Sequence, residues 1–175
     1  MYVPQPPSPT RQTARGEDRL YLTEAKLREG AELMFFGYRS FTRDADAILE
    51  AEGYGRAHHR ALHFIGRNPG INVAGLLAIL GVTKQSLARV LKPLLDDGLV
   101  ESEVGKTDQR QRLLSLTRKG AAFEERLSAP QRARMTRAFR EAGPEAVKGF
   151  RAVLEGMMDD EERSAALGTI QGAKG

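Results

Sequence analysis

The stretch VAGLLAILGVTKQSLARVLKPL, residues 73–94, contains two apolar helical patterns separated by a glycine. The first pattern follows Asn72, whose side chain can accept a hydrogen bond from a free backbone amide of the helix, and it ends at Gly81. Thr83 can cap the second pattern in the same way. A short helix, a tight turn that contains glycine and a second helix form a helix-turn-helix motif, which we predict here.

The second of these helices, KQSLARVLKPLLDD, separates an apolar stripe from a polar and basic face near its N-terminus. In the major groove of DNA, side chains on that face would meet base edges, and the helix N-terminus would favour a phosphate. The alternative is an ordinary two-helix corner with a solvated polar face. Pro93 lies inside this helix and is expected to kink or loosen it. The expected DNA contacts from the cap and this face are Thr83, Lys84, Gln85, Ser86 and Arg89.

After Gly98 the apolar pattern changes from helical to alternating, which predicts two β-strands. LVESEV, residues 99–104, and RLLSL, residues 112–116, flank the loop GKTDQRQ, so this segment predicts a β-hairpin. The chain from residue 106 to residue 119 contains five basic residues and one acidic residue. A charged hairpin directly after a helix-turn-helix predicts a winged helix, whose wing can reach the minor groove of DNA.

The loop and the following strand contain the residues that we expect to contact DNA as a wing. Arg110 would enter the narrow, negatively charged minor groove, and Asp108 would accept from its guanidinium and fix its direction. Lys106 and Arg112 would lie beside phosphates. The alternative is a hairpin kept soluble by its charge, in which Asp108 and Arg110 form a surface ion pair worth less than about 1 kcal/mol.

Helical patterns precede the motif. Residues 23–52 predict a helix of roughly 45 Å, which is longer than a small domain needs for its own core. We therefore expect its apolar stripe to pack on a partner, such as another chain. RAHHRALHFIGR, residues 56–67, predicts a second helix. The apolar stripe of the long helix contains Leu27, Met34, Tyr38, Phe41, Ala45 and Ile48.

After the hairpin, Thr117 can cap a further helix, which we expect to be interrupted at Pro130 and then to resume. Gly143 and Pro144 predict a break before a last helix. Residues 1–19 are rich in proline and are expected to form a disordered arm, and residues 163–175 a flexible tail. The last helix is expected to bury Val147, Phe150 and Leu154, together with Met157 or Met158.

The composition of the 175-residue chain limits its chemistry. A net charge of +4 and a pI near 9.6 favour binding to polyanions where the basic residues are concentrated. The absence of cysteine excludes disulfides, thiolate metal sites and cysteine-based redox sensing, and we expect a reducing, cytoplasmic location. The N-terminus lacks the apolar region of a signal peptide, and no apolar run approaches the length of a membrane span.

Two stretches carry a resemblance to a known family. LLAILGVTKQSLARVLKPLLDDGLV followed by DQRQRLLSLTRKG resembles the winged helix-turn-helix of the MarR family of transcription regulators. Its most specific marks are the order aspartate, any residue, arginine in the wing, and the closing leucine, threonine, two basic residues and glycine. The resemblance extends more loosely over residues 22–158, because the long first helix and the last two helices of the family form a homodimer interface.

The resemblance implies a mainly α fold with a small β-hairpin wing (α+β), in which a winged helix-turn-helix lobe joins a helical dimerisation lobe. Residues 20–162 would form a single domain, with dimerisation helices in residues 20–54 and 118–162 and the DNA-binding lobe in residues 55–117. It also implies an obligate homodimer that reads a pseudo-palindromic operator in double-stranded DNA, and repression is the commoner mode of the family. Pro93 and Pro130 depart from the family pattern and bear on the spacing of the two DNA-binding lobes.

Members of the family often bind small aromatic or anionic ligands between the dimer helices and the DNA-binding lobe, so the resemblance implies relief of repression by a small effector. The candidate ligand-binding residues are Tyr38, His59 and His63, and the two histidines lie one helical turn apart. The alternative is a cluster at the edge of the core with satisfied hydrogen bonds. A metal site would need further ligands such as Asp44 or Asp46, and we expect no metal and no cofactor.

Two other classes of function compete with a DNA-binding regulator. A winged-helix module that binds a protein partner would show only salt-sensitive association with DNA, independent of sequence. An enzyme built on the histidine cluster is disfavoured, because the sequence has no nucleophile elbow, no phosphate-binding glycine loop and no metal motif of suitable spacing. We therefore expect a regulator without catalytic activity.

Overall fold

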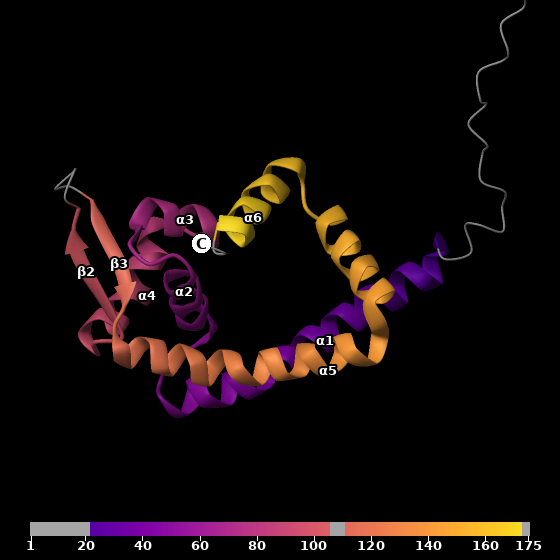
Figure 1. Cartoon of the computed structure of the whole chain (residues 1–175), viewed down its shortest axis with the longest axis horizontal. Helices are drawn as coiled ribbons and strands as arrows, with labels where there is room; N and C mark the ends of the chain where they lie inside the picture. Colours follow the sequence, from indigo (N-terminus) through magenta and orange to yellow (C-terminus); the bar gives the residue numbers. More distant parts are fainter. Residues whose placement is uncertain (1–21, 106–110, 173–175) are drawn as a thin grey trace, which may run out of the picture. The chain divides into compact units, whose positions relative to one another are not determined.

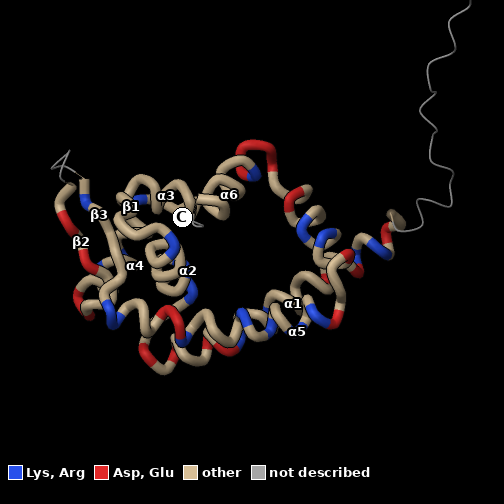
Figure 2. The backbone as a smooth tube through the Cα atoms, viewed as in Figure 1, with Lys and Arg blue, Asp and Glu red and all other residues tan. Residues whose placement is uncertain are grey.

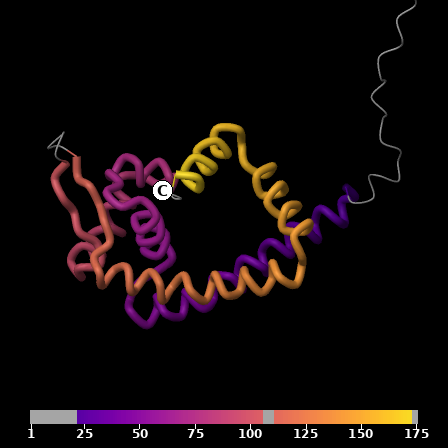
Figure 3. The backbone as a smooth tube through the Cα atoms, in the orientation of Figure 1, coloured from indigo at the N-terminus to yellow at the C-terminus, as the bar shows by residue number. Residues whose placement is uncertain are grey.

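The computed structural model describes residues 22–105 and 111–172, and the chain divides into two compact units, Met1–Ser40 and Phe41–Gly175. The expected N-terminal arm and three of the expected wing residues, Lys106, Asp108 and Arg110, lie outside the described residues. Figure 1 labels the helices and strands β2 and β3, Figure 2 also labels β1, and Figure 3 follows the same backbone from the first element to the last.

The described part of the first unit is the N-terminal part of helix α1 (Glu24–Ala51), which continues without a break into the second unit. The predicted span, residues 23–52, agrees with these bounds to within one residue at each end. An ion pair one turn apart, between Glu24 and Arg28 at 2.6 Å, supports the first turns. Every residue from 22 to 39 is exposed.

The second unit contains the end of α1 and all the other elements, and its one apolar core is formed by residues between Ala45 and Leu127. Its helices and small antiparallel sheet confirm the predicted fold class, mainly α with a β-hairpin wing. In chain order the elements are α2 (Arg56–Arg67), β1 (Ile71–Asn72), α3 (Val73–Leu80), α4 (Lys84–Asp96), β2 (Val100–Val104), β3 (Arg112–Leu116), α5 (Arg118–Gly156) and α6 (Asp160–Gly172).

The sheet has the strand order β1-β3-β2, and both neighbouring pairs are antiparallel. β2 and β3 form the predicted hairpin, in which Val100 lies opposite Leu116. Leu114 of β3 is buried and lies opposite Ile71 of β1. Strand β1 was not predicted, because two residues are too few to show an alternating pattern.

The core of the second unit lies between the sheet and the apolar faces of the end of α1, of α2, α3 and α4, and of the first part of α5. The end of α1 contributes Ala45 and Leu49, and the first part of α5 contributes Phe123 and Leu127. Helix α2 packs against α3, α4 and α5, so it lies at the centre of this core. The largest fully buried side chains of the described residues are Leu49, Leu62, Ile65, Leu76, Leu87, Leu94, Leu114 and Leu127.

Helix α5 corrects one expectation and confirms another. It runs through Pro130 without a break, so the expected interruption there is wrong. Proline removes one helical hydrogen bond, but the packing of α5 against α2 just before Pro130 outweighs this local loss. The backbone leaves the helical range at Gly143 (φ 81°, ψ 168°), where the break was predicted. Pro93 is also accommodated, since α4 continues past it to Asp96.

The C-terminal part of the chain differs from the expectation in two ways. Phe150, Leu154 and Met157 are 45%, 40% and 59% exposed, and Val147 and Met158 are only partly buried, so the described residues leave the last part of α5 largely uncovered. Residues 160–172 form α6, where a flexible tail was expected from residue 163 onwards. The spacing of apolar residues predicted a helix in the last part of α5, but it could not show what covers the apolar face of that helix.

No single helix among the described residues is long and apolar enough to cross a bilayer. Helices α3 and α4 reach that length and composition only as a pair, and the pair is bent by 113°. Leu76 of α3 and Leu87 and Leu94 of α4 are buried in the core of the second unit.

Candidate nucleic-acid interface

Helices α3 and α4 form the predicted helix-turn-helix. The bend of 113° between them lies in the range of this motif, and residues 81–83 join them. Asn72 caps α3, because its Oδ1 accepts from the Gly75 amide at 2.8 Å. Gly81 ends α3 with φ 62°, in the left-handed region that favours glycine. The local caps therefore determine where the two helices begin and end.

Helix α4 directs an apolar side toward the core and a polar side toward solvent at its N-terminal end. Leu87, Leu91 and Leu94 are buried. Thr83 Oγ1 accepts from the Ser86 amide at 3.2 Å, which confirms the predicted cap. The predicted contact residues of this motif, all of them exposed, are Thr83, Lys84, Gln85, Ser86 and Arg89.

The hairpin differs in charge between its two strands. The Gly105 amide donates to Gln111 O at 3.0 Å and closes the strands, and Arg112 at the start of β3 is exposed. Figure 2 shows acidic residues along β2, which are Glu101 and Glu103, both exposed. The predicted charge of the hairpin included only residues 106–119 and left out the two acids of this predicted strand, although the alternation in VESEV places both carboxylates on one face. The basic part of the hairpin therefore begins at its tip.

The end of β3 and the start of α5 attach the base of the wing to α4. Thr117 Oγ1 caps α5 by accepting from the Gly120 amide at 3.0 Å, and the same hydroxyl donates to Gly98 O at 2.7 Å. Lys119 Nζ donates to Asp97 O at 2.9 Å, at the C-terminal end of α4. The closing threonine, lysine and glycine of the sequence motif thus hold α4 and α5 together.

Gly120 permits the close approach of α5 to the chain that leads into β2. A Cβ atom at this position would lie 1.8 Å from the Leu99 carbonyl oxygen, well inside contact distance. The Thr117 amide donates to that same oxygen at 3.1 Å. Any side chain at residue 120 would therefore push α5 away from this hydrogen bond.

The three histidines lie on α2, which packs against α5. His63 Nδ1 lies 3.1 Å from Glu124 Oε1, which also accepts from the Ser128 hydroxyl. The hydrogen bond from His63 lowers the pKa of Glu124, burial opposes that change, and Ser128 reinforces it. Burial lowers the pKa of His59, and the charge of His63 lowers it further. His63 therefore has a hydrogen-bond partner at the edge of the core, and ligand binding by this cluster stays a prediction.

The carboxylates considered as further metal ligands are bonded to arginines. Asp44 Oδ2 lies 2.6 Å from an Arg134 nitrogen, and Asp46 accepts from Arg56 at 2.9 and 2.7 Å. These hydrogen bonds lower the pKa of both aspartates. The described residues contain no group of three or more side chains that could hold a metal ion. Tyr38 is 52% exposed and belongs to the first unit, so its expected place beside the histidines stays a prediction.

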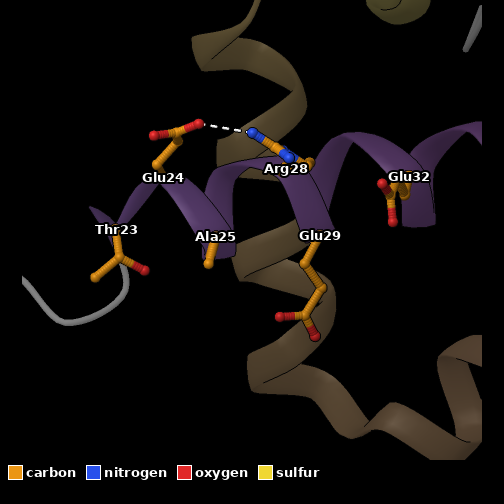
Figure 4. Close-up of a pocket in the computed structure, with 6 residues that line it drawn as sticks. All are labelled: Thr23, Glu24, Ala25, Arg28, Glu29 and Glu32. Carbon is orange, nitrogen blue, oxygen red and sulfur yellow. Dashed lines mark hydrogen bonds and ion pairs between the residues drawn. The ribbon is translucent and has the colours of Figure 1, made fainter.

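Hollows on the described surface offer few enclosing side chains. Figure 4 shows one at the start of α1, where the lining side chains come from Thr23, directly before the helix, and from the first turns of this exposed helix up to Glu32. A single helix face encloses no ligand, so this hollow carries no site. A second cavity of about 220 Å³ lies in the second unit. It is lined by Glu52, Tyr54, Leu99, Lys119, Ala122, Phe123 and Arg126.

Known proteins with similar sequences are transcription regulators. The sequence model of the MarR family matches residues 52–111 of this chain. The HTH-type transcriptional regulator PetP of Rhodobacter capsulatus is 61% identical over 148 residues, which cover 85% of this chain and 89% of PetP. The match to PetP thus includes more than the helix-turn-helix and the wing.

Solved structures agree with this assignment. A MarR-family transcriptional regulator from Silicibacter pomeroyi has a TM-score of 0.62 at 27% identity, and the match covers 78% of this chain and 90% of that one. MepR of S. aureus, solved in complex with DNA, has a TM-score of 0.60 at 18% identity over 73% of this chain and 94% of its own, which shows a shared fold. The helix-turn-helix, the hairpin and the match to PetP together show that this chain belongs to the MarR family of winged helix-turn-helix transcription regulators.

Proposed function

We propose that this chain is a dimeric, sequence-specific DNA-binding transcription regulator, and that it is a repressor relieved by a small ligand. One observation carries the proposal: α4, bent by 113° from α3, exposes a polar and basic face at its N-terminal end. Two comparisons support it. The relative PetP is an HTH-type transcriptional regulator, and MepR, which shares the fold, forms a complex with DNA.

In this proposal the N-terminal turns of α4 enter the major groove. Arg89 is suited to a bidentate contact with guanine, and Gln85 to a bidentate contact with adenine. Lys84 and the first amides of the helix would meet a phosphate. Thr83 and Ser86, joined by the cap, would hold the first turn in the conformation that these contacts need. Base contacts would then come from one exposed helix face.

The wing is proposed to contact DNA beside this groove through Lys106, Asp108, Arg110 and Arg112. Arg112 is exposed at the start of β3, next to the tip of the hairpin. The carboxylates of β2 would be repelled by phosphates, whereas the tip and the start of β3 would be attracted. We therefore expect the wing to approach DNA with its tip and the start of β3, and we place Arg110 in the minor groove with Asp108 as its acceptor.

A second copy of the chain is the proposed partner of the exposed apolar residues. In the first unit, Leu33 and Phe35 of α1 are 64% and 61% exposed. In the second unit, Val153 and Met157 near the end of α5 are also well exposed. Apolar side chains at this density mark an interaction surface, and a homodimer also explains two half-sites in one operator. We expect sedimentation equilibrium to show a dimer, and a monomer at micromolar concentration would contradict this part of the proposal.

The proposed effector is a small aromatic or anionic molecule that binds near Tyr38, His59 and His63. His63 supports this assignment because 44% of its side chain is exposed, so a ligand can reach it. Addition of the effector should raise the melting temperature and lower the affinity for DNA. A His63→Gln variant that responds to the effector as the wild type does would contradict the assignment of this residue.

The central experiment is the selection of bound genomic fragments by purified protein at physiological salt, with unrelated competitor DNA in excess. We expect recovery of a pseudo-palindromic site with half-sites about one helical turn apart. The alternative function is a winged-helix protein-interaction module with non-specific affinity for DNA. In that case no site would be enriched, and the affinity would fall steeply with salt.

Substitution of single arginines tests the residues. Arg89→Ala should weaken binding to the selected site by about 1–3 kcal/mol if Arg89 makes a bidentate base contact, and should relax the preference at one base pair. Arg112→Ala should weaken binding to all sequences equally and reduce the salt dependence. Arg132→Ala is the matched control, because Arg132 pairs with Glu125 on the exposed side of α5. Wild-type affinity from Arg89→Ala would exclude this residue from the interface.

A further inference from the structure

The turn after α1 contains a tyrosine that contacts the far end of α4. The Tyr54 hydroxyl donates to Asp97 Oδ2 at 2.5 Å, and Asp97 is the C-cap residue that directly follows α4. The Tyr54 amide donates to Leu49 O at 2.8 Å, so the turn itself is attached to α1. This side chain therefore connects the end of α1 directly with the end of α4.

The ring of Tyr54 is fixed by its neighbours. It lies 5.5 Å from the ring of Phe123 on α5 and 5.2 Å from the ring of His58 on α2, measured between centroids. Burial and the hydrogen bond to Asp97 raise the pKa of Tyr54 to about 12, so its hydroxyl stays protonated and can donate at neutral pH. Because the ring has little freedom to lose, its hydrogen bond restrains α4 efficiently.

Further bonds around this tyrosine connect the same elements. Lys119 Nζ of α5 donates to the Asp97 carbonyl oxygen at 2.9 Å. The Arg126 guanidinium of α5 pairs with Glu52, just after α1, at 3.1 Å and lies 5.5 Å from the Phe123 ring centroid. The C-terminal end of α4 is thus attached to both α1 and α5, which are the dimerisation helices in the proposed function.

We propose that Tyr54 is a positioning residue: through Asp97 it fixes the orientation of α4 relative to α1 and so sets the half-site spacing that the dimer accepts. The inference rests on the proposed function. Tyr54 lies at the opposite end of α4 from Lys84, Gln85 and Arg89, so it acts through the helix and makes no DNA contact. A helix fixed at that end cannot reorient to follow a displaced half-site.

The test uses the full-length protein and the selected operator, with variants of that operator in which one base pair is added or removed between the half-sites. We expect the wild type to lose at least about tenfold in affinity on the altered spacings, a loss comparable to that of a mismatched base pair. Tyr54→Phe keeps the ring and removes the hydroxyl. It should bind the selected site about three- to tenfold more weakly and should show a spacing penalty of less than about threefold.

Two substitutions at neighbouring aspartates control for charge. Asp97→Ala and Asp96→Ala each remove one acid from the same helix end, but Asp96 pairs with Lys92 at 2.6 Å and does not contact Tyr54 in the described structure. Asp97→Ala should broaden the accepted spacing, whereas Asp96→Ala should not. Asp97→Asn removes the charge but keeps an acceptor oxygen for the Tyr54 hydroxyl. It should therefore show the wild-type spacing preference, which would mean that the hydrogen bond and not the charge of Asp97 sets this preference.

The outcomes distinguish this inference from the proposed function. If the wild type selects no site, the proposed function is wrong and the inference falls with it. If the wild type selects a site and Tyr54→Phe shows the same spacing penalty, the inference alone is wrong. An equal loss of affinity at every spacing, with a lower melting temperature, would also overturn it, because it would reduce Tyr54 to a residue that only stabilises the fold.

Discussion

The two parts of helix α1 have the same type of sequence and very different surroundings. Residues 24–39 are all exposed, including Leu33 at 64%, whereas Thr42, Ala45 and Leu49 further along the same helix are buried. Apolar residues recur at helical spacing in both parts. The periodicity therefore specifies the helix and its apolar face, but the neighbouring elements decide whether that face is covered within the chain.

In the packed core that buries the second part of α1, the most damaging single substitution is expected at Gly120 of α5. Gly120→Ala places a Cβ 1.8 Å from the Leu99 carbonyl oxygen and should reduce the free energy of unfolding by more than about 4 kcal/mol, measured by urea unfolding followed by circular dichroism. Gly149→Ala is the control, because nothing lies within 4 Å of the added atom, and it should be neutral or stabilising by up to about 1 kcal/mol. Similar results for the two variants would contradict the close approach at Gly120.

The same substitution, leucine to alanine, can be made in the buried part and in the exposed part of α1. Leu49 is 1% exposed, so Leu49→Ala should reduce the free energy of unfolding by about 2–5 kcal/mol. Leu33→Ala should change the stability of the protomer itself by less than about 0.5 kcal/mol. It should instead weaken the proposed dimer, because Leu33 is 64% exposed among the residues that the structure describes.

A dilution series separates these two effects. The unfolding midpoint of Leu49→Ala should be lower than that of the wild type at every protein concentration. The difference between Leu33→Ala and the wild type should instead depend on concentration, because dimerisation contributes to the apparent stability. A difference for Leu33→Ala that is independent of concentration would exclude Leu33 from the dimer interface.

The pH dependence of stability that we expect from His59 on α2 is weaker than any of these effects. Burial, followed by the charge of His63, lowers its pKa below the ordinary value of 6.5, while Glu124 and Asp46 act in the opposite direction. The unfolded chain then binds the proton more readily, so stability is fully present above pH 6.5 and falls as the pH drops toward the pKa of the folded state. His59→Gln should remove this part of the pH dependence, and a curve parallel to that of the wild type would contradict it.

The features that sequence analysis predicted well depend on residues close together in the chain. Asn72, Thr83 and Thr117 each accept from an amide three positions later, and all three predicted caps are confirmed. The hairpin also follows from local alternation. Local rules likewise predicted the break at Gly143, where the backbone is left-handed.

The features that it missed depend on distant contacts. Proline at residue 130 disfavours a helix locally, but the packing of α5 against α2 retains it. The exposure of Phe150 depends on what covers α5, which no spacing can show. Tyr54 and Asp97 are 43 positions apart, and nothing in either local pattern marks them as partners. The predicted wing residues 106, 108 and 110 lie outside the described residues and remain predictions.

The hydrogen bond between Gly105 and Gln111 bears on how a protein of this kind can diversify. It joins the two ends of residues 106–110, and the strand pairing from Val104 and Arg112 onwards holds the register behind it. Doubling the length of a loop costs only about 0.6 kcal/mol of closure entropy. Insertions at this point would leave the register and the core intact, so a lineage can change the length and charge of the chain here while its folding stability is conserved.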